Sequence, residues 1–309
     1  MTDAALQNSA QLPEIDPAAA LEPLKSATRR WPAYLSGIIS LLLLGGLGYE
    51  LFRGGFSGLQ QSMPSNPLFY IVFLVVYFIG PVADYTIFRH LWGLPLSGLV
   101  PVLRKTVANE VLLGYSGEAY FYAWARAKLD MVAAPFAAIK DVSILSAVVG
   151  NVFTLLLLGI ASPFAFELLP PELVKPVIWS AVIVISMSLG ILFFRGRLFS
   201  LERSELRWVF ITHIIRTLSY TGLLALCWHL SLREVPLAIW MLLVTSRALV
   251  SRLPLIPNKD IVFANLALLL VGRDDAVAHL VAITVALTLV CHAIVLVATW
   301  LPFFNRSET

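Results

Sequence analysis

Several runs of more than about 18 apolar residues, almost free of charge, restrict what this chain can fold into. Residues 276–301, for example, contain no Asp, Glu, Lys or Arg. A helix rises about 1.5 Å per residue, so about 20 such residues cross the hydrocarbon layer of a bilayer. The composition agrees, because 59% of the 309 residues are hydrophobic, 13% are charged, and the mean hydropathy is +0.83. We therefore expect an all-α, polytopic helical membrane protein.

About seven transmembrane helices and two broken or re-entrant helical segments are expected. The seven runs are 34–52, 67–88, 141–165, 174–194, 207–230, 236–253 and 276–301. The segments 94–131 and 254–272 are also apolar, but prolines and glycines interrupt them. Such breaks are tolerated at membrane depth where protein or a wet cavity satisfies the backbone. Each broken segment is therefore expected to form short helices around an interruption.

The helical membrane domain, 34–303, is expected to lie between two short tails. Residues 1–33 are rich in Ala, Pro, Gln and acids, which predicts a disordered cytoplasmic tail, and 304–309 form a short tail. Lys and Arg gather before the first span and in alternate loops. By the positive-inside rule this predicts a multi-pass protein of the cell inner membrane with a cytoplasmic N-terminus. The C-terminal topology stays open, with a cytoplasmic exit at Arg273 favoured.

Composition and motifs exclude several function classes. A net charge of +3, from 22 basic and 19 acidic residues, is too dispersed for nucleic-acid binding. Cys227 and Cys291 lie in apolar runs and make neither a disulfide framework nor a metal site. Asp275 and His279 fit a helix cap better than a metal site. With no Gly-rich phosphate loop, GxSxG or HExxH motif, no cofactor or metal is expected, and enzymatic activity is uncertain and disfavoured.

Ionisable groups at bilayer depth each cost about 2.5–3.5 kcal/mol on insertion scales, so each is a functional hypothesis. The densest group occupies the first broken segment: Asn109, Glu110, Glu118 and Arg126. Glu118 is expected in the first turn of a new helix, where the helix dipole favours a carboxylate. One interpretation is a dipole-stabilised acid beside an interfacial aromatic belt. The other is a break that exposes backbone and Glu118 to a polar cavity.

A second group of polar residues occupies two later spans. His213, Arg216 and Tyr220 are spaced i, i+3, i+7 and share one helical face. Arg216 suits either an internal ion pair or a phosphate, because its planar fork donates two bonds at once. Arg247 lies on the next span, and Arg252 follows it before a proline-rich turn. Arg252 and Lys259 are expected either to snorkel to headgroups or to bind anionic lipid heads at the mouth of a cavity.

These segments resemble the flippase-like membrane region associated with lysylphosphatidylglycerol synthases, which also occurs as a stand-alone bacterial membrane protein. The resemblance rests on Asn109, on Gly117-Glu118 and on Arg126, and on the proline-rich turn after Arg252. The family's Pro-Gly-Gly-Leu-Gly and its following Glu are replaced here by Pro254-Leu-Ile-Pro257-Asn-Lys-Asp260. The resemblance implies a helical bundle with re-entrant helices around a polar cavity, through which a phospholipid or lipid-linked headgroup crosses the bilayer.

Three functions are therefore considered. The favoured hypothesis is translocation of a lipid, with membrane lipids, above all anionic headgroups, as the partner. Its substrate-binding residues are Asn109, Glu110, Glu118, Arg126, His213, Arg216, Tyr220, Arg247 and Arg252. The alternatives are a non-catalytic membrane partner subunit and a membrane-embedded enzyme that modifies a lipid headgroup with Glu118 or His213 as acid or base. A membrane-protein partner or a homo-oligomer is compatible with each.

Overall fold

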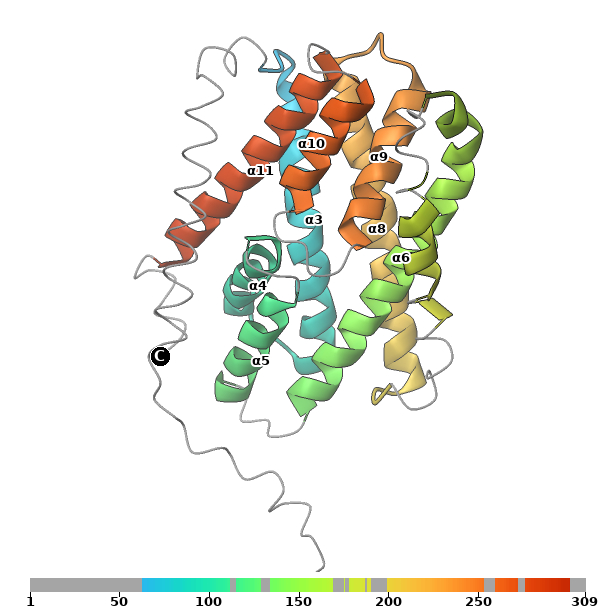
Figure 1. The fold of residues 1–309 in the computed structure, drawn as a ribbon. Helices are drawn as coiled ribbons and strands as arrows, with labels where there is room; N and C mark the ends of the chain where they lie inside the picture. The colour runs from blue at the N-terminus through green and yellow to red at the C-terminus, as the bar shows by residue number, and fades with distance from the viewer. Residues whose placement is uncertain are drawn as a thin grey trace, which may run out of the picture.

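The computed structural model describes residues 63–111, 115–128, 134–168, 175, 178–186, 188–189, 199–252, 259–271 and 276–300 (Figure 1). This part of the chain is helical and contains no β-strand, which confirms the all-α prediction. Its principal helices are α3 (Pro67–Trp92), α4 (Leu99–Val111), α5 (Ser116–Lys128), α6 (Ala134–Leu168), α8 (Arg203–Ser231), α9 (Leu237–Arg252), α10 (Lys259–Val271) and α11 (Ala276–Trp300). A short 3₁₀ turn, Leu96–Gly98, precedes α4.

Four of the described helices are long and apolar enough to cross a membrane, which is compatible with a membrane protein. They are Pro67–Trp92, Pro135–Pro163, Arg203–Ser231 and Ala276–Thr299. The expected count of about seven spans is not confirmed. The run 34–52 lies outside the described residues, and 174–194 lies partly outside them. The run 236–253 forms α9, whose 16 residues are short for a span.

Local signals set the ends of α3. Asn66 caps its N-terminus by accepting a hydrogen bond from the Leu68 backbone N–H at 3.0 Å, and Pro67 occupies the first turn, where its missing N–H costs nothing. Gly93 ends the helix in the left-handed region at φ 68°, and its N–H donates to the Arg89 carbonyl. Capping and turn residues at the two ends of a long apolar run therefore define this helix.

The first broken segment, 94–131, forms a hairpin of two short helices, α4 and α5. The described part of the second, 254–272, forms one helix, α10, which makes a hairpin with α9 from the expected span 236–253. α4 and α5, of 13 residues each, pack against one another, as do α9 and α10. In Figure 1 these hairpins come from opposite ends of the bundle, and the inner ends of their helices lie near its middle. Each hairpin thus brings two helix ends into the interior. The prediction of short helices around an interruption is confirmed for 94–131, whereas the described part of 254–272 forms only α10.

Two apolar clusters lie at opposite ends of the bundle. The first contains Phe69, Phe73, Leu157, Trp228, Trp240, Phe263 and Val281 among its buried residues. The second contains Ile87, Phe88, Val102, Phe121, Ile139 and Val209. α3 runs from the first cluster to the second, whereas α6 and α8 run from the second to the first. α3 and α8, which pack together, are therefore antiparallel.

The order of elements repeats with inverted direction. A long helix, a short hairpin and a second long helix occur as α3, α4–α5, α6 and again as α8, α9–α10, α11. α11 begins in the first cluster and ends beside α4, where the Arg104 side chain donates to the Thr299 carbonyl, so it is antiparallel to α6. The contacts repeat as well, because α6 packs on α9 and α11 packs on α4. The described residues thus form two inverted halves.

Candidate functional site

A cavity of about 430 Å³ lies between the two apolar clusters. Its lining includes the middle of all four candidate spans and the inner ends of both hairpins. The charged residues that line it are Asp84, Lys105, Glu110, Glu118, Arg216, Arg247, Arg252, Lys259 and Asp260. A polar cavity in this position agrees with the rule that irregular backbone at membrane depth lines protein or water.

The first ionic cluster joins α3, α4, α5 and α8. The Lys105 ammonium lies 2.5 Å from Asp84 Oδ2 and 3.5 Å from Glu118 Oε1. The Arg216 guanidinium lies 3.3 Å from Asp84 Oδ1 and donates to Ser146 Oγ of α6 at 2.7 Å. Asp84 and Lys105 are buried, and a buried charge is tolerated only when it is paired and hydrogen-bonded. This cluster therefore holds five helices in register around the cavity.

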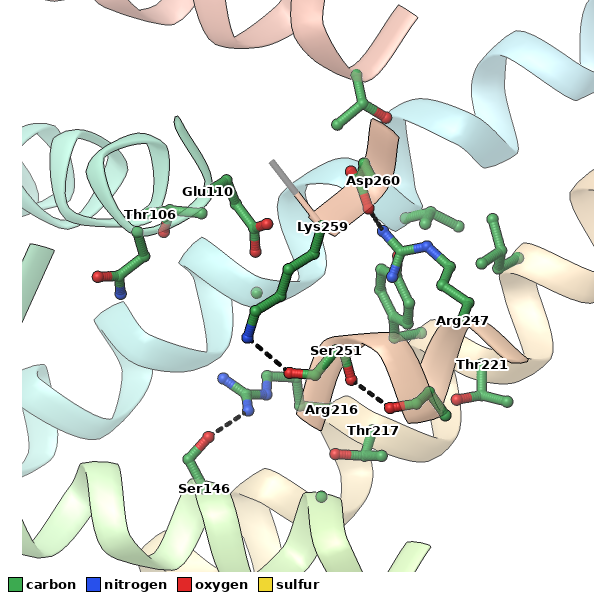
Figure 2. A pocket seen from close by; sticks show the side chains of 18 of the residues that line it. Thr106, Glu110, Ser146, Arg216, Thr217, Thr221, Arg247, Ser251, Lys259 and Asp260 are labelled. Carbon is green, nitrogen blue, oxygen red and sulfur yellow. Dashed lines mark hydrogen bonds and ion pairs between the residues drawn. The ribbon is translucent and has the colours of Figure 1, made fainter. Parts of the chain in front are cut away.

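The second ionic cluster joins α9 and α10. Arg247 donates to Asp260 Oδ1 at 2.6 Å, as Figure 2 shows. The same guanidinium lies over two rings, 5.1 Å from the Tyr220 centroid and 5.9 Å from the Phe263 centroid. Rings at these distances attract a cation through their quadrupoles. Arg247 is thus held by charge and by aromatic faces together.

The two hairpins carry matching ion pairs. In each one, a base on the first helix pairs with the acid in the first turn of the second helix: Lys105 with Glu118, and Arg247 with Asp260. Lys105 lies 142 positions before Arg247, and Glu118 lies 142 positions before Asp260. The first residues of α6 and α11, Ala134 and Ala276, have the same separation. The inverted halves therefore correspond residue by residue across this region.

Three further charges face the cavity without an ion pair in the described part of the chain. Arg252 donates from Nε to Ser251 Oγ at 3.0 Å. Lys259 donates to the Ser251 backbone carbonyl at 2.7 Å. Glu110, at the end of α4, is exposed and has neither a hydrogen bond nor an ion pair among the described residues. These groups retain donors and acceptors for a bound molecule.

Gly150 of α6 makes room for the Arg252 guanidinium. A Cβ at position 150 would overlap Arg252 Nη1 and would lie 3.1 Å from Nη2. Glycine therefore allows the end of this side chain to lie against the α6 backbone. The guanidinium is positioned by this close approach, and its fork of donors is not consumed by a carboxylate of the described residues.

The structure brings most of the sequence-predicted residues together. Those that line the cavity are Asn109, Glu110, Glu118, His213, Arg216, Tyr220, Arg247 and Arg252, whereas Arg126, on α5, does not line it. Asn109 also caps α5, because its Oδ1 accepts from the Gly117 N–H at 2.7 Å. His213 is fully buried, and its Nε2 lies 3.2 Å from the Val142 carbonyl.

The expected substrate-binding residues did not include Asp84, Lys105 or Asp260, and Lys259 was expected only at the mouth of a cavity. Lys105, Lys259 and Asp260 stand beside breaks in the apolar pattern, where they resemble ordinary interfacial charges. One signal was available, because base and acid are 13 positions apart in both broken segments. Reading that spacing as two equivalent hairpins would have placed Lys105 and Asp260 on the cavity, as the partners of Glu118 and Arg247.

Comparisons with protein-family models, with curated proteins and with solved structures give no match to this chain.

Proposed function

We propose that this chain translocates a lipid across the cell inner membrane by passing its polar headgroup through the cavity between the inverted halves. The observation that carries the proposal is the polar cavity halfway along four apolar helices, with Arg252 and Lys259 free of ion pairs in the described part. A phosphate suits such a site, because Arg and Lys donors form charge-assisted hydrogen bonds with it. The acyl chains of the lipid would stay in the bilayer, against the apolar outer faces of the helices.

The inverted arrangement supports transport over a purely structural role. In many transporters, inverted repeats place the substrate at their interface near the bilayer midplane, where interrupted helices supply the polar contacts. Here the ends of α4, α5, α9 and α10 occupy that position. Because a fold alone does not establish a function, the charges in the cavity carry the proposal. The similarity to the flippase-like family in Asn109 and Gly117-Glu118 is consistent with it.

The distribution of bases supports one orientation. Arg89, Lys140 and Arg203 belong to the ends of α3, α6 and α8 near the second apolar cluster. By the positive-inside rule we assign this end to the cytoplasm. A cytoplasmic N-terminus then requires one crossing before α3. Arg273 lies outside the described residues, but α11 begins three positions later at the opposite end, which argues against the expected cytoplasmic exit there.

Proteoliposomes test the proposal. Phospholipids with a short fluorescent acyl chain and natural headgroups are reconstituted with the full chain, and dithionite bleaches the label in the outer leaflet. We expect bleaching beyond the outer-leaflet fraction in wild type and a loss of most of that excess in Arg252→Gln and Arg216→Gln. Arg233→Gln, on an exposed residue outside the cavity, is the matched control.

Bleaching equal to that of protein-free liposomes, across anionic and zwitterionic lipids, would contradict lipid translocation. In that case, copurification after mild solubilisation examines the partner-subunit alternative. Conversion of a labelled lipid to a new product would instead favour the enzyme. Equal flux in wild type and Arg252→Gln would show that lipids cross elsewhere than through this cavity.

A further inference from the structure

Equivalent positions of the two hairpins carry opposite charges. Glu110 near the end of α4 and Arg252 at the end of α9 are 142 positions apart, the separation that relates Lys105 to Arg247. Both line the same cavity. The inverted halves are therefore alike in backbone at this place and opposite in charge. A cavity that served an anion alone would gain from a base at both positions.

The basic side of the cavity is organised for a phosphate. Arg252 approaches the α6 backbone at Gly150 and uses Nε on Ser251, which leaves the terminal nitrogens of its fork. Lys259 uses one donor on the Ser251 carbonyl and has two others. Ser251 thus anchors both cations close to one another. Two neighbouring cations without an acid between them in the described residues match the several oxygens of one phosphate.

The acidic side is a carboxylate without a hydrogen bond or ion pair among the described residues. Glu110 reaches from α4 into the space beside Lys259, as Figure 2 shows. No ion pair joins it to Lys259 or Arg252 in the structure. A carboxylate with free acceptors at membrane depth suits an ammonium group, which donates two or three charge-assisted bonds. Acid and base thus face one cavity from opposite hairpins.

We propose that the headgroup taken by this cavity is zwitterionic, with its phosphate on Arg252 and Lys259 and its ammonium on Glu110. Ethanolamine-type phospholipids carry both groups a few atoms apart. This inference rests on the proposed function for the lipid and names the chemical class of the headgroup. Glycerol-type headgroups offer the phosphate without the ammonium, and they leave Glu110 facing an anion.

Headgroup analogues test the charge assignment with the detergent-solubilised full chain. Calorimetry compares phosphoethanolamine with glycerol 3-phosphate and inorganic phosphate. We expect wild type to bind phosphoethanolamine about tenfold more tightly than glycerol 3-phosphate, as one charged hydrogen bond suggests. Glu110→Gln should abolish that difference. Arg252→Gln should weaken all three compounds, and Glu234→Gln, on an exposed acid outside the cavity, should change none.

A reversal of charge provides a second test if Glu110→Gln does not fold. Glu110→Lys places a base at the position that corresponds to Arg252. We expect it to bind glycerol 3-phosphate more tightly than phosphoethanolamine. If Glu110→Gln instead strengthens the binding of all three compounds equally, Glu110 is a counter-ion of the cations, and the inference is overturned. An unchanged preference in either variant also overturns it.

Vesicles distinguish a lipid headgroup from a free compound. Acyl-labelled phosphatidylethanolamine and phosphatidylglycerol are compared in the bleaching assay. Faster flux of phosphatidylethanolamine in wild type, equal flux of both lipids in Glu110→Gln, and a preference retained in Glu234→Gln support the inference. Lipid flux with no dependence on Glu110 overturns the inference and keeps the translocation. Binding of phosphoethanolamine without flux of any lipid overturns the translocation and keeps the headgroup class.

Discussion

Gly150 and Gly117 each leave room for a neighbouring group, but the two neighbours differ. At Gly150 the neighbour is the far end of the Arg252 side chain, which can move. At Gly117 the neighbour is the Lys105 backbone carbonyl, with Asn109 Oδ1 2.8 Å from the same Cβ position. A flexible side chain yields to an added methyl group, and a helix backbone does not. The two glycines therefore predict different consequences for the same substitution.

Gly150→Ala should displace the Arg252 guanidinium with little loss of stability. Alanine also favours the α6 helix, which offsets part of the crowding. The expected result is weaker binding of inorganic phosphate, measured by calorimetry, with a melting temperature near that of wild type. Gly159→Ala on the same helix is the control, because its Cβ meets nothing within 4 Å. Unchanged phosphate binding in Gly150→Ala would separate Arg252 from the site.

Gly117→Ala should destabilise the α4–α5 hairpin, because its Cβ would overlap the Lys105 carbonyl. Crowding of this kind costs about 1–3 kcal/mol. Thermal unfolding in detergent should show a lower melting temperature. Gly222→Ala, in open space on α8, should not. A Gly117→Ala protein as stable as wild type would mean that α4 and α5 separate easily.

At the level of elements, the hairpin ion pairs differ in how they are supported. Lys105 touches two acids and also lies 5.7 Å from the Phe88 ring centroid. Arg247 touches one acid, and two rings hold it when that acid is lost. The Arg247–Asp260 pair is therefore the simpler one in which to measure how strongly an ion pair couples the two helices of a hairpin. The exposed His90–Glu205 pair, at 2.9 Å, provides a comparison outside the cavity.

A double-mutant cycle on Arg247→Gln and Asp260→Asn should show coupling. Each single change leaves a charge in a partly buried place, so each is expected to lower the stability by about 2 kcal/mol. The double variant should lose less than the sum. The same cycle on His90→Gln and Glu205→Gln should give a coupling below about 1 kcal/mol. Additive effects on stability at Arg247 and Asp260 would show that this ion pair does not couple α9 to α10.

The hairpins were partly predictable from sequence. Prolines and glycines interrupt apolar runs at 94–131 and 254–272, and backbone satisfaction at membrane depth restricts such breaks to interior positions. The α9 helix was predicted as a full span, because 236–253 is apolar along most of its length. Its 16 residues end at Arg252 inside the bundle. A hydropathy profile shows how many consecutive residues are apolar, and it does not show where a helix ends and the chain turns back.

At the scale of the molecule, the inverted relation could not be read from apolar patterning. Helices of opposite direction have the same apolar pattern, because both cross the same bilayer. The corresponding residues also differ in type, since Lys105 corresponds to Arg247 and Glu118 to Asp260. Individual site residues such as Arg216 and Glu118 were predictable from the sequence, because charged residues at membrane depth are energetically costly and therefore rare. Their partners were not, because Asp84 meets Lys105 and Arg216 only through long-range packing.

Cysteine labelling should establish the orientation in the membrane. Ser204→Cys lies at the end near the second apolar cluster, and Glu234→Cys lies at the other end, both at exposed positions. With a membrane-impermeant maleimide, intact spheroplasts should label Glu234→Cys, whereas Ser204→Cys should react only after permeabilisation. The wild-type chain is the control for labelling of its own thiols, because Cys227 is fully buried but Cys291 is only half-buried. The opposite pattern would reverse the assigned orientation.

The opposite charges at Glu110 and Arg252 also bear on voltage. Moving one elementary charge across a membrane changes the energy by about 2.3 kcal/mol per 100 mV. A headgroup whose phosphate and ammonium cancel carries no net charge through the cavity, so an applied potential does no work on it. Its transbilayer distribution would then be set by lipid concentrations in the two leaflets, whatever the energisation of the cell.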